Sequence, residues 1–218
     1  MLQKDYIMRL IQQLTRVLLK ILFNVENKNF DAAQKEVDRA YAGLTGIDAT
    51  MINSMSAEDI ILLLSRGKKF EAEKCMMIAK LLKAEGDILD ASQRTAAGAI
   101  EKYHKSLNLF LELYALQDEL LIKNFLDDLP VLINKTSGSL FDPGTKYKIL
   151  CYYEHAGQYD KAENILFELA EINYPGIVEQ GHEFYKRLLQ KNNEDLIDGN
   201  LPREELLRGM KDLEDNFS

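Results

Sequence analysis

The segment that decides the fold spans residues 147–175 and reads YKILCYYEHAGQYDKAENILFELAEINYP. An apolar helix ends at Gly157, because glycine readily adopts the left-handed backbone that closes many helices. A second helix begins at Tyr159, and a small residue, Ala162, follows three positions later. A small side chain lets two helices approach closely, so we expect Ala162 at their tightest crossing. The segment therefore predicts an antiparallel pair of packed helices.

The same spacing of aromatic or aliphatic, small and apolar residues recurs in two other places. It starts at Tyr159 in the strongest instance, and at Ile88 and Phe30 in the weaker ones. Repeated helical pairs stack into solenoids, because each pair covers the apolar face of the next. Grooves on such solenoids bind peptides or helices of other proteins.

These residues resemble the tetratricopeptide repeat superfamily, with the best match over 143–176, a second over 72–105 and a third over 14–41. The chain departs from the family pattern because it has no tryptophan and because Pro175 comes one residue late. The resemblance implies an all-α fold, in which tetratricopeptide-like helical hairpins stack as a short, irregular α-solenoid over one domain, 1–218. It also implies a protein-protein interaction scaffold or adaptor without catalytic activity.

In the tetratricopeptide family the first helix of each repeat lines the binding groove. The resemblance places the following residues there: Tyr147, Cys151, Glu154 and His155 in the best unit, and Met76, Lys80 and Lys83 in the second. Aromatic, methionine and charged side chains suit the binding of a peptide or a helix. The alternative is that some of these side chains pack against a neighbouring helix.

Helical periodicity and turn residues outline the remaining elements. We expect helices over 3–23, 30–44, 56–66, 69–85, 145–156, 159–172 and 176–191, and a last helix after Pro202. Between them, residues 88–129 are expected to be almost continuously helical, with a bend near Ala115–Asp118. Residues 47–55 are expected to be irregular. The 134–144 loop is a candidate subdomain boundary, because it contains Thr-Ser-Gly-Ser and Asp-Pro-Gly.

Charge and composition indicate which partners and which cellular compartment to expect. The net charge of −8 argues against nucleic-acid binding, which needs a basic surface. Neither a signal peptide nor a membrane span is expected, and Cys75 and Cys151 form no CxxC pair, so a cytoplasmic protein with reduced thiols is favoured. The opening residues 5–11, DYIMRLI, resemble an uncharacterised family of small cytosolic proteins from Gram-positive anaerobes, which implies the same compartment but no chemistry.

The first predicted helix suggests an alternative function. Residues 1–23 carry a net charge of +3, whereas the rest of the chain carries −11. A basic amphipathic helix of this kind can lie on an anionic membrane, which would make the protein a peripheral membrane adaptor. The other interpretation is that its apolar stripe covers the open end of the repeat stack.

A metal-dependent enzyme is a weaker alternative. Two Glu-x-x-His pairs, Glu101/His104 and Glu179/His182, have the spacing found in di-iron helical bundles. Both pairs lie away from the apolar face of their helices, so we interpret them as solvated surface. No pairing of a nucleophile with a base is evident. The sequence therefore predicts no catalytic residues, no metal and no other cofactor.

Overall fold

The computed structural model describes residues 2–67, 70–138 and 140–217, and it describes the side chains of these residues except for 2–6 and 120. The described chain is helical and contains no β-strand, which confirms the all-α class. Its contacts divide it into two compact units, Met1–Ser139 and Leu140–Ser218. The division falls inside the segment 134–144 that was predicted as a loop, although helices reach Thr136 on one side and begin at Pro143 on the other. Each unit is described by itself.

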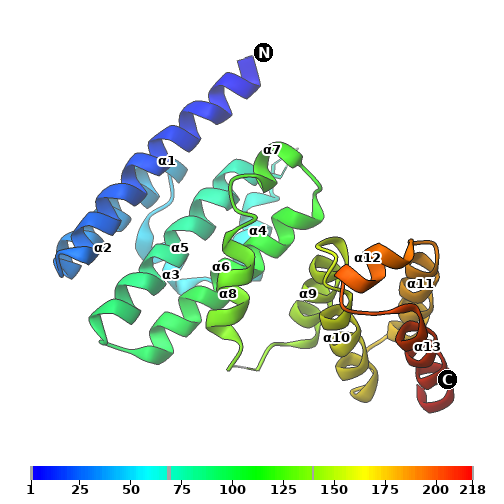
Figure 1. Cartoon of the computed structure of the whole chain (residues 1–218). Helices are drawn as coiled ribbons and strands as arrows, with labels where there is room; N and C mark the ends of the chain where they lie inside the picture. The colour runs from blue at the N-terminus through cyan, green and yellow to red at the C-terminus, as the bar shows by residue number, and fades with distance from the viewer. Residues whose placement is uncertain (1, 68–69, 139, 218) are drawn as a thin grey trace. The chain divides into compact units, whose positions relative to one another are not determined.

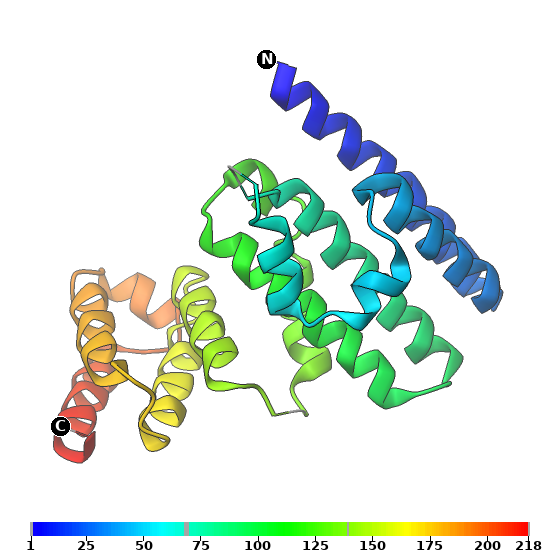
Figure 2. The same cartoon turned by 180° about the vertical axis from the view of Figure 1, so that it is seen from behind.

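The N-terminal unit contains two long helical hairpins (Figures 1 and 2). In the first hairpin α1 packs along α2, and in the second α5 packs along α6, which α8 also contacts. Its elements are α1 (Leu2–Glu26), α2 (Phe30–Ala40), the π-helical turn η1 (Tyr41–Thr45), α3 (Ala49–Ser54), α4 (Ala57–Leu64), α5 (Ala72–Ser92), α6 (Ala96–Ala115), α7 (Glu119–Ile122) and α8 (Asp128–Thr136).

Local sequence explains where several of these helices begin and how they pack. The predicted cap of α4 is confirmed, because the Ser56 hydroxyl accepts a hydrogen bond from the Asp59 amide at 3.1 Å. The small and β-branched residues Ala33 and Val37 of α2 are fully buried. Their compact side chains let α2 lie close to its neighbours α1 and α5.

The helix breaks between residues 69 and 129 differ in part from those predicted. Gly86 does not end a helix, because α5 continues to Ser92 and closes at Gln93, which has a left-handed backbone. Thr95 then caps α6 by accepting a hydrogen bond from the Gly98 amide. The almost continuous helical stretch predicted over 88–129 is thus interrupted at residues 93–95, and the spacing that begins at Ile88 crosses a turn. The bend predicted near Ala115–Asp118 is confirmed, because α6 ends at Ala115 and α7 begins at Glu119. The segment 47–55, expected to be irregular, contains the short helix α3.

Gly86 is a packing glycine in the middle of α5. An added Cβ would lie 2.5 Å from the ring of Tyr103, which is 2% exposed. We therefore expect Gly86→Ala to destabilise the N-terminal unit by ~1–3 kcal/mol through overpacking, despite the better helix propensity of alanine. Gly43→Ala is the matched control, because a Cβ there meets nothing within 4 Å. Urea denaturation of both variants measures the difference, and equal midpoints would contradict this packing.

The C-terminal unit is built from two pairs of packed helices, α9 with α10 and α11 with α13. Its elements are α9 (Pro143–His155), α10 (Tyr159–Glu171), α11 (Ile177–Leu189), α12 (Asn193–Asp198) and α13 (Arg203–Phe217). The helices predicted over 145–156, 159–172 and 176–191 are confirmed to within two residues at each end. The short helix α12, capped by Asn192, was not predicted.

Ala162 lies in the core of the C-terminal unit and is fully buried, as the sequence predicted. We expect Ala162→Leu to force α9 and α10 apart and to cost ~1–3 kcal/mol of the free energy of unfolding. Chemical denaturation of this variant beside Ala156→Leu, which alters an exposed position, measures the effect. If both variants unfold like the parent protein, Ala162 is not at a tight helix crossing.

Candidate protein-binding groove

A groove in the N-terminal unit lies where α1, α5 and α8 meet. It encloses a cavity of about 220 Å³. The helix α1 supplies an apolar wall, and α5 and α8 supply the charged side chains of the opposite wall. The lining residues are Leu18, Ile21, Leu22 and Val25 of α1, Lys80, Lys83, Ala84 and Asp87 of α5, and Asp128 of α8.

The apolar wall exists because α1 carries two apolar stripes. One stripe, Ile7, Leu14 and Ile21, is buried against the rest of the unit. The second stripe alternates steps of three and four residues, which is the spacing of a coiled-coil seam. It consists of Met8, Ile11, Leu18, Leu22 and Val25, with Thr15 as its one polar member. None of these six residues is buried, so the unit leaves this seam accessible along α1.

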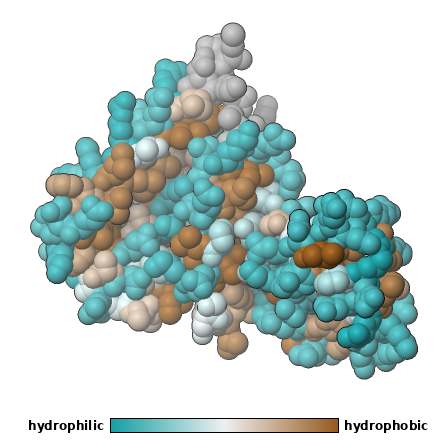
Figure 3. All heavy atoms as spheres, viewed as in Figure 1, coloured by the Kyte–Doolittle hydropathy of each residue, from teal (hydrophilic) through white to brown (hydrophobic). Residues whose placement is uncertain are grey.

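Exposed apolar side chains extend the groove at its rim. Leu22 is 53% exposed on α1, and Val131 is 42% exposed on α8. Val131 lies one turn after Asp128 and therefore on the same face of α8. Figure 3 shows apolar surface along α1 and over the neighbouring helices of this unit. An uncovered apolar surface of this kind is typical of an interaction site.

Ion pairs fix α8 to α5 at the charged side of the groove. Lys80 Nζ lies 2.5 Å from Asp128 Oδ2, and Lys83 Nζ lies 3.1 Å from Asp87 Oδ2 and 3.8 Å from Asp128 Oδ1. Lys80 and Asp128 have side chains only 19% and 16% exposed. Partly desolvated pairs are stronger than fully exposed ones, so this wall is held in place before any partner arrives.

A second set of contacts ties the other end of α8 to the α5–α6 hairpin. The Tyr103 hydroxyl donates to Asp87 at 2.9 Å, and Lys135 Nζ lies 3.0 Å from that hydroxyl and 2.8 Å from Asp90. Burial, and then the charges of Asp87 and Asp90, raise the pKa of Tyr103 above its ordinary value. The hydroxyl therefore keeps its proton and remains a hydrogen-bond donor.

The resemblance placed Met76, Lys80 and Lys83, from the second repeat match over 72–105, together in a groove. The structure does not keep them together. Lys80 and Lys83 line the groove described here. Met76, one turn earlier on α5, is 1% exposed and belongs to the core. The physical reason is that α5 is surrounded by α1, α2, α4 and α6, which leave only a narrow strip of it accessible.

The four residues proposed in the best repeat match lie on α9 in the C-terminal unit, and two of them form hydrogen bonds to α11. Glu154 accepts two hydrogen bonds from Arg187, at 2.6 and 2.8 Å. Tyr147 donates to Gln180 at 3.3 Å. Cys151 is half-buried, and burial raises the pKa of its thiol. His155 is exposed. Tyr147 and Glu154 thus make the helix–helix contacts that were the alternative interpretation.

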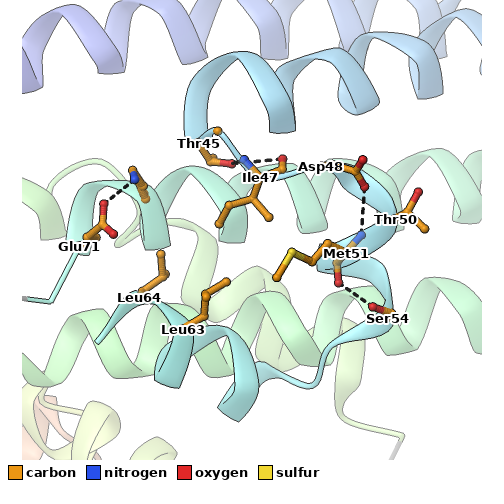
Figure 4. Close-up of a pocket in the computed structure, with 11 residues that line it drawn as sticks. Thr45, Ile47, Asp48, Thr50, Met51, Ser54, Leu63, Leu64 and Glu71 are labelled. Carbon is orange, nitrogen blue, oxygen red and sulfur yellow. Dashed lines mark hydrogen bonds and ion pairs between the residues drawn. The ribbon is translucent and has the colours of Figure 1, made fainter. Parts of the chain in front are cut away.

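A second hollow of the N-terminal unit lies between the η1–α3 segment and α4 (Figure 4). Ile47, Met51 and Leu63 point into a shallow space of about 950 Å³. Several polar groups at its rim are already engaged within the fold. Asp48 caps α3 by accepting from the Met51 amide at 3.2 Å, and Glu71 pairs with Lys74 at 2.5 Å.

The two Glu-x-x-His pairs lie in different units. The carboxylate of Glu101 pairs with Lys105 at 2.9 Å, and His182 lies 3.9 Å from Glu214. Within the ranges that the structure describes, no group of three or more His, Cys, Asp and Glu side chains could hold a metal ion.

No described helix is both long enough and apolar enough to cross a membrane.

Sequence reasoning missed the accessible seam of α1 and the contribution of α8. The seam could have been found, since its steps of three and four residues are visible in residues 8–25. Asp128 carries no comparable local signal. Its role follows from the tertiary contact that brings α8 beside α5.

Comparison with known proteins identifies the family of the chain. The model of a family of unknown function (DUF6483) matches residues 1–218, so the chain belongs to that family. Neither the curated proteins nor the solved structures contain a match.

Proposed function

We propose that the chain, as a member of this family of unknown function, is a cytoplasmic, non-catalytic adaptor that binds an amphipathic helix of a partner protein. The accessible seam of α1 carries the proposal. A helix with its own apolar stripe can pack along Met8, Leu18 and Leu22 by inserting side chains between them. Beside it lies the cavity that Leu18, Lys80 and Asp128 line.

The charged wall suits a partner helix with polar flanks. Lys83 and Asp87 of α5 are partly exposed, with side chains 22% and 37% accessible. Polar side chains of the partner can approach them without leaving a buried charge unpaired, since the two already pair with each other. The apolar seam would then supply most of the affinity, and the charged wall would set the orientation of the bound helix.

The helical pairs also support a tetratricopeptide-like arrangement. In the C-terminal unit α11 contacts α10, and its side chains bond to α9 through Glu154 and Arg187. Successive pairs in a tetratricopeptide stack make contacts of this kind, with the first helices side by side.

Quantitative affinity capture tests the proposed function. The full-length protein and two variants, Leu22→Glu and Leu207→Glu, are used as baits in extract of the cell of origin. Leu207 of α13 is the matched control, because it is 47% exposed while Leu22 is 53% exposed. We expect Leu22→Glu to lower recovery of a specific partner at least tenfold, since it places a charge in the apolar seam. The proposed binding site would be contradicted if Leu207→Glu lowered recovery as much as Leu22→Glu does. It would also be contradicted if neither variant lowered recovery.

A further inference from the structure

The outer face of α1 carries exposed apolar and basic side chains together. Leu19 is 60% exposed and Phe23 is 64% exposed. Arg9, Arg16 and Lys20 are exposed as well. At 100° per residue, Leu19 and Phe23 lie about 40° apart, and the three cations lie within about 60° of Phe23. Bulky apolar side chains and cations thus share one side of the helix.

This face is distinct from the groove. Neither Leu19 nor Phe23 lines the cavity between α1, α5 and α8. They border a shallow hollow together with Lys20 and Asn24 of α1 and Glu36 of α2. The carboxylate of Glu36 lies 3.0 Å from the Arg39 guanidinium, which offsets its negative charge. The face therefore keeps its positive character at this border.

The spread of the cations favours an extended anionic surface over a single carboxylate. From Arg9 to Lys20 they extend along roughly 16 Å of helix at 1.5 Å per residue. A bilayer with anionic lipids presents phosphates over that whole length, and its acyl boundary accepts protruding aromatic and aliphatic side chains. Residues 1–23 are positive while the rest of the chain is negative, so this helix is where the chain can approach such a surface.

We propose that the outer face of α1 docks onto an anionic membrane surface. Leu19 and Phe23 enter the boundary between headgroups and acyl chains, and Arg9, Arg16 and Lys20 meet lipid phosphates. The helix lies in the plane of the membrane and does not cross it. This inference goes beyond helix binding in the groove and does not depend on it, because other side chains of α1 carry it.

Sedimentation of the full-length protein with lipid vesicles tests the proposal. The vesicles contain phosphatidylcholine, with or without phosphatidylglycerol. We expect binding to the anionic vesicles that weakens as salt is added. We expect the pair Arg16→Gln with Lys20→Gln, and separately the pair Leu19→Ser with Phe23→Ser, to weaken binding about tenfold or more.

Substitutions on α13 supply the matched controls. Arg208→Gln with Lys211→Gln removes the same charge from exposed positions, and Leu207→Ser removes an exposed leucine. These variants should bind the vesicles like the parent protein. The proposal is overturned if the parent protein ignores anionic vesicles, or if the α1 and α13 variants lose binding equally. A third result would also overturn it. If the free protein is a dimer that Leu19→Ser with Phe23→Ser abolishes, and the parent protein does not bind vesicles, then this face binds a second copy of the chain.

Discussion

Replacing Glu85 by alanine should destabilise the N-terminal unit by about 3–5 kcal/mol, because it removes a buried carboxylate and so breaks an ion pair with Lys102 that is largely shielded from water. Glu85 is 2% exposed, and its Oε2 lies 3.0 Å from Lys102 Nζ. Its Oε1 accepts hydrogen bonds from Gln34 at 3.0 Å and from Asn53 at 3.2 Å. The carboxylate therefore joins α2, α3, α5 and α6, and its loss affects all four helices.

Glu101→Ala is the control for this prediction. Its carboxylate also pairs with a lysine, Lys105, at 2.9 Å, but its side chain is 60% exposed. Exposed pairs contribute little, so its unfolding free energy should change by no more than ~0.5 kcal/mol. Chemical denaturation followed by circular dichroism compares the two variants. Similar small effects would mean that Glu85 is accessible to water and does not hold the unit together.

Deleting residues 1–23 should cause aggregation or oligomerisation of the remaining chain. The buried stripe of α1 contributes Ile7, Leu14 and Ile21, each worth ~1.5–3 kcal/mol when fully buried. Its removal uncovers apolar parts of α2 and α5, which α1 contacts. Size-exclusion chromatography with light scattering measures the outcome.

A truncated protein that keeps the oligomeric state of the parent and melts like it would show that α1 is not part of the folded unit. The groove would then lose its apolar wall as a fixed feature. The variant Leu19→Ser with Phe23→Ser provides the comparison, because it changes the outer face and leaves the buried stripe intact. We expect that variant to keep the oligomeric state and the melting transition of the parent.

The periodicity of the sequence was sufficient for the helices that carry one clear apolar stripe. The second helix of the pair around Ala162 shows this, since Gly157 precedes it, Pro175 follows it, and its core positions follow a helical period. The same reasoning failed at Gly86, because a glycine that ends a helix and a glycine that admits a neighbouring ring look alike in sequence. The contact with Tyr103 is tertiary and decides between them.

The candidate site was predictable only in part, because local sequence indicates the face of a helix but not the neighbours that cover it. Lys80 and Lys83 were expected at a groove, and they line one with Leu22 and Asp128. Met76 has the same helical face but is buried, because neighbouring helices cover that turn of α5. Burial of an apolar residue on a central helix depends on how many helices surround it, and this number is not encoded locally.

Site-specific photo-crosslinking tests the central claim, that the seam of α1 binds a partner helix, most directly. A photoreactive amino acid is placed at Leu22 or Val131 in the groove, or at Leu207 as the control, in the full-length protein inside the cell of origin. The account predicts crosslinks from both groove positions to one protein, at partner residues spaced three or four apart on a helix. Crosslinks from Leu207 to the same residues, or none from Leu22 and Val131, would contradict it.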